Sequence, residues 1–259
     1  MGSPNFRFKQ FTVWHDRCAM KVGTDGVLLG AWSPLMEFRS SYLTSFERLF
    51  ASECSGVQEG RKVLDIGTGS GLIALMLAQR LPDAQITAID IDNGAVEQAN
   101  YNFQQSPWVE RLDCQQTALQ DLAGEGIYDL IVSNPPYFQD SLKNPDSLRA
   151  MARHTDTLSY SELLAHSARL LTHNGTLALV LPIEAEQQII ALAQAHKLYP
   201  THITHVFPKP GKAAKRLLIA FSQSPIANSQ APIANSLTLE SETAPRSKEY
   251  QELTKDFYL

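Results

Sequence analysis

The stretch "VLDIGTGSGLIAL", residues 63–75, decides the fold that we expect for this chain. It joins a short apolar segment to a longer one through a turn that holds Gly67, Gly69 and Gly71. Glycine adopts backbone torsions that other residues resist, and it lets a ligand approach the main chain closely. The pattern predicts a buried strand, a ligand-binding turn and a helix. A tight turn that binds no ligand remains the alternative.

The alternation of strand and helix continues along the chain. Further strands are predicted at 86–90, 128–133 and 175–182, and helices at 72–81, 93–105, 160–171 and 183–196. Such alternation is typical of a doubly wound, mostly parallel α/β sheet, here with seven strands. Residues 201–207 and 215–221 have only a short turn between them, which predicts an antiparallel pair at one edge. Residues 236–242 could add a further edge strand, and 249–259 a closing helix.

The N-terminal part, residues 1–60, is expected to form a hairpin and helical extension that packs on a core domain of residues 61–259. Residues 6–15 alternate apolar and polar side chains, as a strand or hairpin does. Thr24 or Asp25 is expected to cap the helix that follows.

Length and composition suit one large α/β domain. The chain has 259 residues, of which 44% are hydrophobic and 19% charged, so a full core is possible. No apolar run approaches the ~18 residues of a membrane-spanning helix, and the start lacks a signal-peptide pattern. Cys18, Cys54 and Cys114 form no CxxC pair. Neither a disulfide framework nor a metal site is therefore expected, and the cytoplasm is the expected compartment.

The charge is unevenly distributed along the chain. A formal net charge of -5 argues against a general binder of polyanions. Between Gln187 and Leu239, however, there is no Asp or Glu. This stretch is either a solvated surface or a face that contacts phosphates. Its basic side chains are Lys197, Lys209, Lys212, Lys215 and Arg216, with His196, His202 and His205.

The residues around the glycine turn indicate which ligand it binds. The glycine spacing differs from the GxGxxG of dinucleotide-binding proteins, which disfavours a nicotinamide oxidoreductase. Asp65 would not help to bind a pyrophosphate but suits a cationic amine. S-adenosylmethionine carries an ammonium group, a sulfonium and ribose hydroxyls. Asp90, at the end of the next strand, could accept both ribose hydroxyls, and Ile91 offers an apolar face to an adenine. The predicted cofactor is S-adenosylmethionine.

Residues 133–138, "SNPPYF", end a later strand with two prolines. Pro135 and Pro136 lack N–H donors and restrict the backbone. They leave two acceptors, the side-chain oxygen of Asn134 and the main-chain carbonyl of Pro135. These acceptors would hold both hydrogens of a conjugated amine and free its lone pair for attack. Tyr137 would stack on the planar substrate, worth ~1–3 kcal/mol for a base. A proline-rich strand stop with a core tyrosine is the alternative.

The motifs "DIGTGSG", "AIDID" and "SNPPY" together resemble those of class I S-adenosylmethionine-dependent amino methyltransferases. The segments "FKQFTVWHDRCAMKVGTDGVLLGAW", "ARHTDTLS" and "LTKDFYL" narrow the resemblance to the bacterial tRNA1(Val) adenine N6-methyltransferase family, over nearly the whole chain. This resemblance implies a Rossmann-like fold and methyl transfer to the N6 amine of the adenosine beside the anticodon, position 37. The implied partner is tRNA, recognised at its anticodon stem-loop.

The resemblance and the residues around it give a set of expected site residues. Cofactor contacts are expected from Lys21, Thr24, Asp65, Gly67, Gly69, Gly71, Asp90, Ile91 and Asn134. The catalytic residues are expected to be Asn134, Pro135 and Tyr137. Substrate contacts are expected from Pro136, Phe138, Arg149, Arg153, Lys209, Lys212, Lys215 and Arg216.

Some features depart from the family pattern. Thr117 and Ala118 stand where related enzymes often have an Asp near the adenine. Residues 35–60 look like an insertion, as does the repeated "PIANS" at 225–229 and 232–236. Trp14 and His15 are expected to pack in the hairpin rather than to act in catalysis.

Two other functions use the same motifs. "NPPY" also occurs in methyltransferases that act on glutamine amides of proteins, so it does not name the owner of the amine. A non-catalytic RNA-binding protein on a methyltransferase scaffold is the second alternative.

Overall fold

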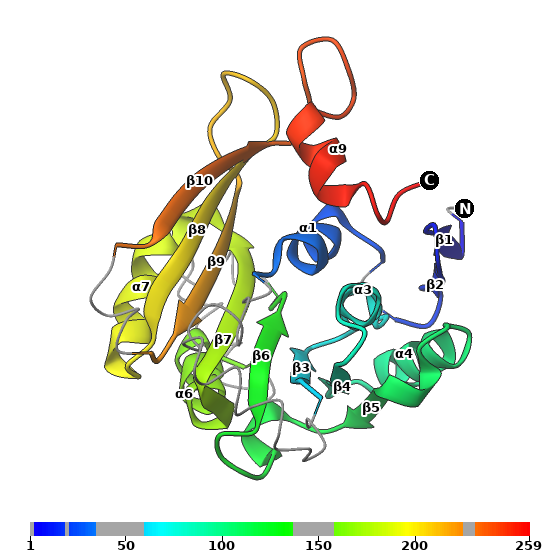
Figure 1. Ribbon diagram of the computed structural model, residues 1–259, viewed down its shortest axis with the longest axis vertical. Coiled ribbons are helices and arrows are strands. Elements are labelled where there is room, and N and C mark those ends of the chain that lie inside the picture. The colour runs from blue at the N-terminus through cyan, green and yellow to red at the C-terminus, as the bar shows by residue number, and fades with distance from the viewer. Residues whose placement is uncertain (1–2, 19–20, 35–59, 137–157, 225–230) are drawn as a thin grey trace, which may run out of the picture.

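One large sheet organises the molecule. The computed structural model describes residues 3–18, 21–34, 60–136, 158–224 and 231–259 (Figure 1). In this part of the chain eight strands lie in the order β10-β8-β9-β7-β6-β3-β4-β5. They are β3 (Lys62–Ile66), β4 (Gln85–Asp90), β5 (Leu112–Gln116), β6 (Tyr128–Ser133), β7 (Leu171–Pro182), β8 (Tyr199–Phe207), β9 (Arg216–Ser222) and β10 (Ile233–Thr238).

The doubly wound, mostly parallel sheet is confirmed, but the strand count and one edge differ from the expectation. The strands β8 and β9 are antiparallel as predicted. They do not form the edge, because β10 adds beyond β8 and runs parallel to it. Strand β10 is the further edge strand expected at 236–242, but it begins at Ile233 and ends at Thr238. The sheet of the described residues therefore has eight strands rather than seven. The second "PIANS" supplies the first residues of β10, so the prediction of a loop insertion is wrong for that copy. The first copy, 225–229, lies outside the described residues.

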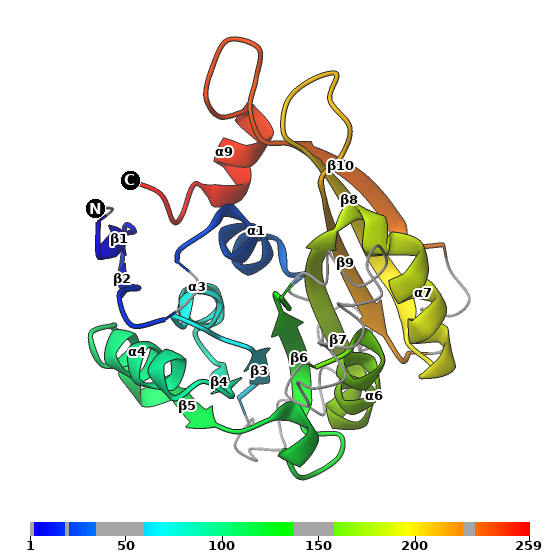
Figure 2. The same cartoon turned by 180° about the vertical axis from the view of Figure 1, so that it is seen from behind.

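Helices cover both faces of the sheet (Figures 1 and 2). On one face lie α1 (Thr24–Trp32), α3 (Leu72–Arg80), α4 (Asn93–Gln104) and α9 (Lys248–Thr254), and on the other α6 (Tyr160–Leu170) and α7 (Glu186–Ala195). Short 3-10 turns occupy Val109–Arg111, Leu119–Asp121 and Ile183–Ala185.

The central strands are buried on both faces because their successive side chains enter different cores. On β3, Val63 packs in the core beneath α1 and α3, whereas Leu64 and Ile66 pack in the core beneath α6 and α7. On β6, Val132 packs in the first of these cores and Ile131 in the second. A continuous apolar run is therefore the expected pattern for these strands, as parallel sheets show.

A short N-terminal hairpin, β1 (Asn5–Arg7) with β2 (Thr12–Trp14), is fixed to the core by one buried amide. The Trp14 N–H donates to Asn102 Oδ1 at 2.9 Å. Asn102 Nδ2 in turn donates to the carbonyls of Trp14 and Ser70, each at 2.8 Å. His15 is buried, its Nδ1 accepts from the Val22 N–H, and its Nε2 lies 3.0 Å from the Ser3 carbonyl. These contacts confirm the packed hairpin.

The chain ends beside the hairpin. The Lys9 N–H donates to the Phe257 carbonyl at 2.8 Å, and the rings of Phe8 and Tyr258 stack with centroids 5.9 Å apart. The division into an extension of residues 1–60 and a core domain of 61–259 stays a prediction.

The expected cap of α1 is wrong. Its N-cap residue is Gly23, in extended conformation, and no side chain caps the helix there. Asp25 in the first turn instead forms an ion pair with a distant residue, described below. The expected insertion at 35–60 lies outside the described residues, except for Gly60.

Replacing Gly71 by Ala is expected to destabilise the fold more than the same change at Gly211. Both glycines have positive φ, +79° and +70°, which costs a Cβ-bearing residue about 1–2 kcal/mol. A Cβ at Gly71 would also lie 2.6 Å from Cε1 of Phe103, whereas Gly211 faces open space. Urea unfolding should therefore give a loss of roughly 2–4 kcal/mol for Gly71→Ala and about 1–2 kcal/mol for Gly211→Ala. Equal losses would contradict this packing role.

Candidate functional site

The carboxyl ends of three central strands meet at one edge of the sheet (Figure 2). Strands β3 and β6 pair in parallel with Ile66 opposite Ser133, and Ser133 Oγ donates to the Ile66 carbonyl at 2.9 Å. Strand β4 lies on the other side of β3, with Ile89 opposite Ile66. The N–H groups of Gly67 and Thr68 both donate to the Ile89 carbonyl. The glycine turn, the end of β4 and the "NPP" segment therefore start side by side.

Asp65 is a fully buried carboxylate directly before the glycine turn. Its Oδ2 accepts from the Thr68 hydroxyl at 2.6 Å and from the Ala74 N–H at 3.2 Å. Its Oδ1 is buried and has no hydrogen-bond partner among the residues that the structure describes. Buried carboxylate oxygens are rarely left this way, so the site is incomplete without a donor.

The surroundings of Asp65 favour a cation. Burial raises the pKa of its carboxyl from 3.8 to about 7; nearby Asp90 raises it as well, while the bonds from Thr68 and Ala74 lower it. An adjacent positive charge would reverse this effect and hold the carboxylate ionised. An ammonium group supplies both that charge and the missing donor.

The glycine turn leaves room for such a ligand. Gly67 and Gly69 have φ of +68° and +56°, and a Cβ on either would meet no atom of the described residues within 4 Å. The main chain is therefore open to close approach at both positions. Gly71 differs, because a Cβ there would collide with Phe103, so it is needed for packing rather than for access.

Asp90 is held beside the turn by two main-chain donors. Its Oδ2 accepts from the Gly69 N–H at 2.9 Å, and its Oδ1 accepts from the Asp92 N–H at 3.0 Å. Carboxylate oxygens accept more than one hydrogen bond, so ribose hydroxyls can still be bound. Ile91 follows with its side chain 55% exposed, which is unusual for isoleucine and suits an adenine ring.

These residues fit S-adenosylmethionine. Asp65 Oδ1 would take the ammonium group, the open backbone at Gly67 and Gly69 would accommodate the chain, and Asp90 would bind the ribose. At the departure from the family pattern, the Thr117 N–H donates to the Asp90 carbonyl at 3.1 Å. Thr117 thus supports the end of β4 through its main chain, but its side chain does not supply the carboxylate that related enzymes often have here.

The predicted amine site follows β6 directly. Pro135 is buried, Asn134 is half-buried and Pro136 is exposed. Tyr137 and Phe138, and likewise Arg149 and Arg153, lie outside the described residues, so their expected roles stay predictions.

Lys21 and Thr24 lie exposed at the start of α1. That end of α1 is near the glycine turn, because a Cβ on Gly26 would sit 3.0 Å from Cδ2 of Leu72, the first residue of α3. Within the described ranges neither side chain bonds to Asp65 or Asp90, and their cofactor role stays a prediction.

The basic residues divide into two groups. Lys212 and Lys215 are exposed in the loop between β8 and β9. Lys209 pairs with Glu240 at 2.9 Å, and Arg216 pairs with Asp25 at 2.9 Å. The loop belongs to the same edge as the glycine turn, because Arg216 lies opposite Pro182 at the carboxyl end of β7.

Three supporting residues were not named from the sequence. Thr68 donates to Asp65 from within the glycine turn, three residues along the chain. Ser133 holds the end of β3 through a contact between residues 67 positions apart, which no local pattern predicts. Asp92 accepts from the N–H groups of Gly94 and Ala95 and so caps α4. An Asp before a helical pattern is a recognised start signal, so this role could have been found.

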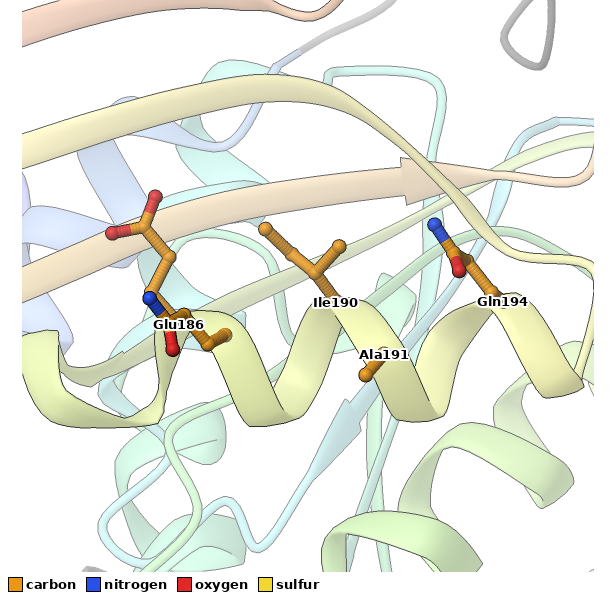
Figure 3. Close-up of a pocket in the computed structure, with 5 residues that line it drawn as sticks. Glu186, Ile190, Ala191 and Gln194 are labelled. Atoms are coloured by element: carbon orange, nitrogen blue, oxygen red, sulfur yellow. The ribbon is translucent and has the colours of Figure 1, made fainter.

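A hollow along α7 is not part of this site. Figure 3 shows Glu186, Ile190, Ala191 and Gln194 along one side of the helix, and Gln187 completes the lining. None of these residues is among the expected site residues.

None of the helices in the described part of the chain has the length and hydropathy needed to cross a bilayer. In the same ranges, His, Cys, Asp and Glu side chains form no cluster of three or more that could hold a metal ion.

Comparisons with known proteins agree with this geometry. The family model of the methyltransferase small domain matches residues 47–199. A relative from Parabacteroides distasonis named tRNA1(Val) (adenine(37)-N6)-methyltransferase is 49% identical over 261 residues, which cover 100% of this chain and 99% of the relative. The chain therefore belongs to the tRNA1(Val) (adenine(37)-N6)-methyltransferase family. It is an enzyme of the S-adenosylmethionine-dependent methyltransferase class.

Other members of the tRNA1(Val) (adenine(37)-N6)-methyltransferase family match over similar lengths. The relative from Bacteroides thetaiotaomicron is 45% identical, with 100% of this chain and 99% of the relative covered. The relative from Flavobacterium psychrophilum is 41% identical, with 98% and 99% covered. A crystal structure of a predicted O-methyltransferase from Agrobacterium tumefaciens superposes with a TM-score of 0.63 at 14% identity, covering 90% of this chain and 96% of that one. This likeness confirms the Rossmann-like methyltransferase fold.

Cofactor affinity is expected to fall as the pH drops below about 7, because Asp65 must lose its proton before it can pair with an ammonium group. For S-adenosylhomocysteine, calorimetry from about pH 7.5 to 5.5 should give a Kd that rises by up to tenfold per pH unit. Asp65→Asn should bind weakly at every pH and lose this dependence. Asp113→Asn, which removes an exposed carboxylate from β5, is the matched control and should behave like the wild type. A pH-independent Kd in the wild type would contradict the assignment.

Proposed function

We propose that this protein transfers the methyl group of S-adenosylmethionine to the N6 amine of adenosine 37 in tRNA1(Val), recognised within the anticodon stem-loop. The relatives carry this activity in their names. The observation that supports the proposal most strongly is the pairing of Ile66 with Ser133, because it brings "NPP" beside the turn that follows Asp65.

The amine acceptors provide the mechanism. Asn134 Oδ1 and the Pro135 carbonyl accept the two N6 hydrogens, which draws the nitrogen out of conjugation with the ring. The bound cofactor supplies an electrophilic methyl group on a sulfonium. Asn134 and Pro135 would hold the nitrogen lone pair in line with that methyl group, so that the new N–C bond would form as the S–C bond breaks and leaves its electron pair on the sulfur. The extra proton on the nitrogen leaves along an acceptor hydrogen bond to solvent.

This mechanism needs alignment rather than a strong base. Orientation of the amine against the methyl carbon contributes ~7–11 kcal/mol in well-aligned reactions. The adenine must first leave its stack, at a cost of about a few kcal/mol that is smaller in a single-stranded loop than in a duplex. Tyr137 is proposed as the stacking partner, with Pro136 and Phe138 beside it.

RNA fits the charge of this edge better than a protein amide does. Lys212 and Lys215 are exposed at the carboxyl edge, in a stretch with no acidic residue. They are proposed to contact phosphates of the stem-loop, with Arg149 and Arg153 guiding the strand. A glutamine methyltransferase has no evident use for such a loop. Since tRNA is its substrate, we place the enzyme in the cytoplasm.

Asn134→Ala is expected to lower kcat for methyl transfer to tRNA by about 10²–10³-fold, because one of the two amine acceptors is lost. The Kd for S-adenosylhomocysteine should change by only about two- to threefold. Transfer of labelled methyl groups to unmodified tRNA, followed by nucleoside analysis, measures the activity.

The matched control for this variant is Asn235→Ala, which removes an exposed amide from β10 and should keep full activity. An active Asn134→Ala enzyme would disprove the mechanism. Label found in a protein glutamine instead of RNA would favour the alternative function, and binding of RNA without cofactor affinity would favour the non-catalytic one.

A further inference from the structure

An ion pair joins two segments that are far apart in the chain. Nε of Arg216 donates to both carboxylate oxygens of Asp25, at 3.0 and 2.9 Å. Arg216 is the first residue of β9, and Asp25 lies in the first turn of α1. Their side chains are only 31% and 20% exposed, so water and salt screen this pair less than the surface pair Lys209–Glu240, at 58% and 40%.

On one side, the ion pair adjoins a loop that we call the basic loop, residues 208–215, because Arg216 follows it directly. This loop carries Lys209, Lys212 and Lys215. Main-chain hydrogen bonds give the loop a defined shape. The Lys212 N–H donates to the Lys209 carbonyl, and the Lys215 N–H donates to the Val206 carbonyl. Arg216 also donates through Nη1 to the Lys215 carbonyl at 3.1 Å. A phosphate held by Lys215 is therefore bound by the residue next to Arg216, and one held by Lys212 is bound four residues away from it.

On the other side, the pair holds a helix that touches the cofactor turn. Helix α1 packs against α3 so closely that a Cβ on Gly30 would lie 2.7 Å from Sδ of Met76, and one on Gly26 would lie 3.0 Å from Leu72. Leu72 follows Gly71, the last residue of the glycine turn. A shift of the first turn of α1 must therefore be felt by Leu72 and the turn before it.

We propose that the Asp25–Arg216 ion pair couples RNA binding at the basic loop to cofactor binding at the glycine turn. This inference rests on the proposed function and adds a positioning role for both residues. It also replaces the expectation that Arg216 itself contacts phosphate. RNA would order the basic loop, and the cofactor would order the glycine turn. Because the ion pair and α1 link the two, the ligand that binds second has less conformational entropy to remove. The coupling is reciprocal, as binding linkage requires.

The test compares the Kd of S-adenosylhomocysteine with and without saturating unmodified tRNA. In the wild type, tRNA is expected to tighten binding by at least about fivefold, the lower end of usual coupling factors. In Asp25→Asn, Arg216→Gln and the double variant, this factor should fall to less than about twofold, and to the same value in all three. Equal values follow because either change removes the same pair.

Glu240→Gln is the matched control. It breaks the Lys209–Glu240 pair of the same loop, in which neither partner belongs to α1, and should keep the full coupling factor. The inference is overturned if the wild type shows no coupling. It is also overturned if the pair variants lose thermal stability or affinity equally with and without tRNA, since the pair is then a structural brace alone.

Methyl transfer by the same wild-type preparation separates this inference from the proposed function. An enzyme that methylates tRNA but shows no coupling contradicts only the inference. An enzyme that does not methylate tRNA contradicts the proposed function, and the inference falls with it.

Discussion

The pairing of β3 with β6 is the constraint on which the site depends. With Ile66 opposite Ser133, the two strands end at the same level, and the Ser133 hydroxyl bonds to the Ile66 carbonyl across them. A slip of one residue would turn every side chain of a strand to the other face and bury the wrong set. On β3 it would move Leu64 and Ile66 out of the core beneath α6 and α7 and into the core beneath α1 and α3. The packing of the sheet thus sets the distance between the glycine turn, where the methyl donor would bind, and the "NPP" segment, where the amine would bind.

A second constraint is electrostatic. The fold keeps the Asp65 carboxylate away from water and satisfies only one of its oxygens. Such a group destabilises the free protein when it is ionised, because burial favours its protonated form. A cationic ligand removes this unfavourable free energy, so relief of the buried charge contributes to the affinity for the cofactor. Sites that are strained in this manner are typical of function rather than of stability.

The sequence predicted the fold where the pattern is local, and failed where contacts are distant. The strand–turn–helix of residues 63–75 and the alternation after it follow from apolar runs and glycines. The antiparallel pair and a further edge strand after it were predicted, but the parallel pairing of β10 with β8 was not, because it depends on a distant neighbour that no local pattern reveals. Asp65, Asp90 and Asn134 could be named because they adjoin motifs. The link of Asp25 to Arg216 could not, since 191 residues separate them.

The most direct measurement uses two tRNA1(Val) transcripts that differ only at position 37. One carries adenosine, and the other carries inosine, which has an oxygen in place of the exocyclic amine. With labelled S-adenosylmethionine, the account predicts one methyl group per adenosine transcript, recovered as N6-methyladenosine, and none on the inosine transcript. Label on the inosine transcript, or on a nucleoside other than adenosine 37, would contradict the claim that this site methylates that amine.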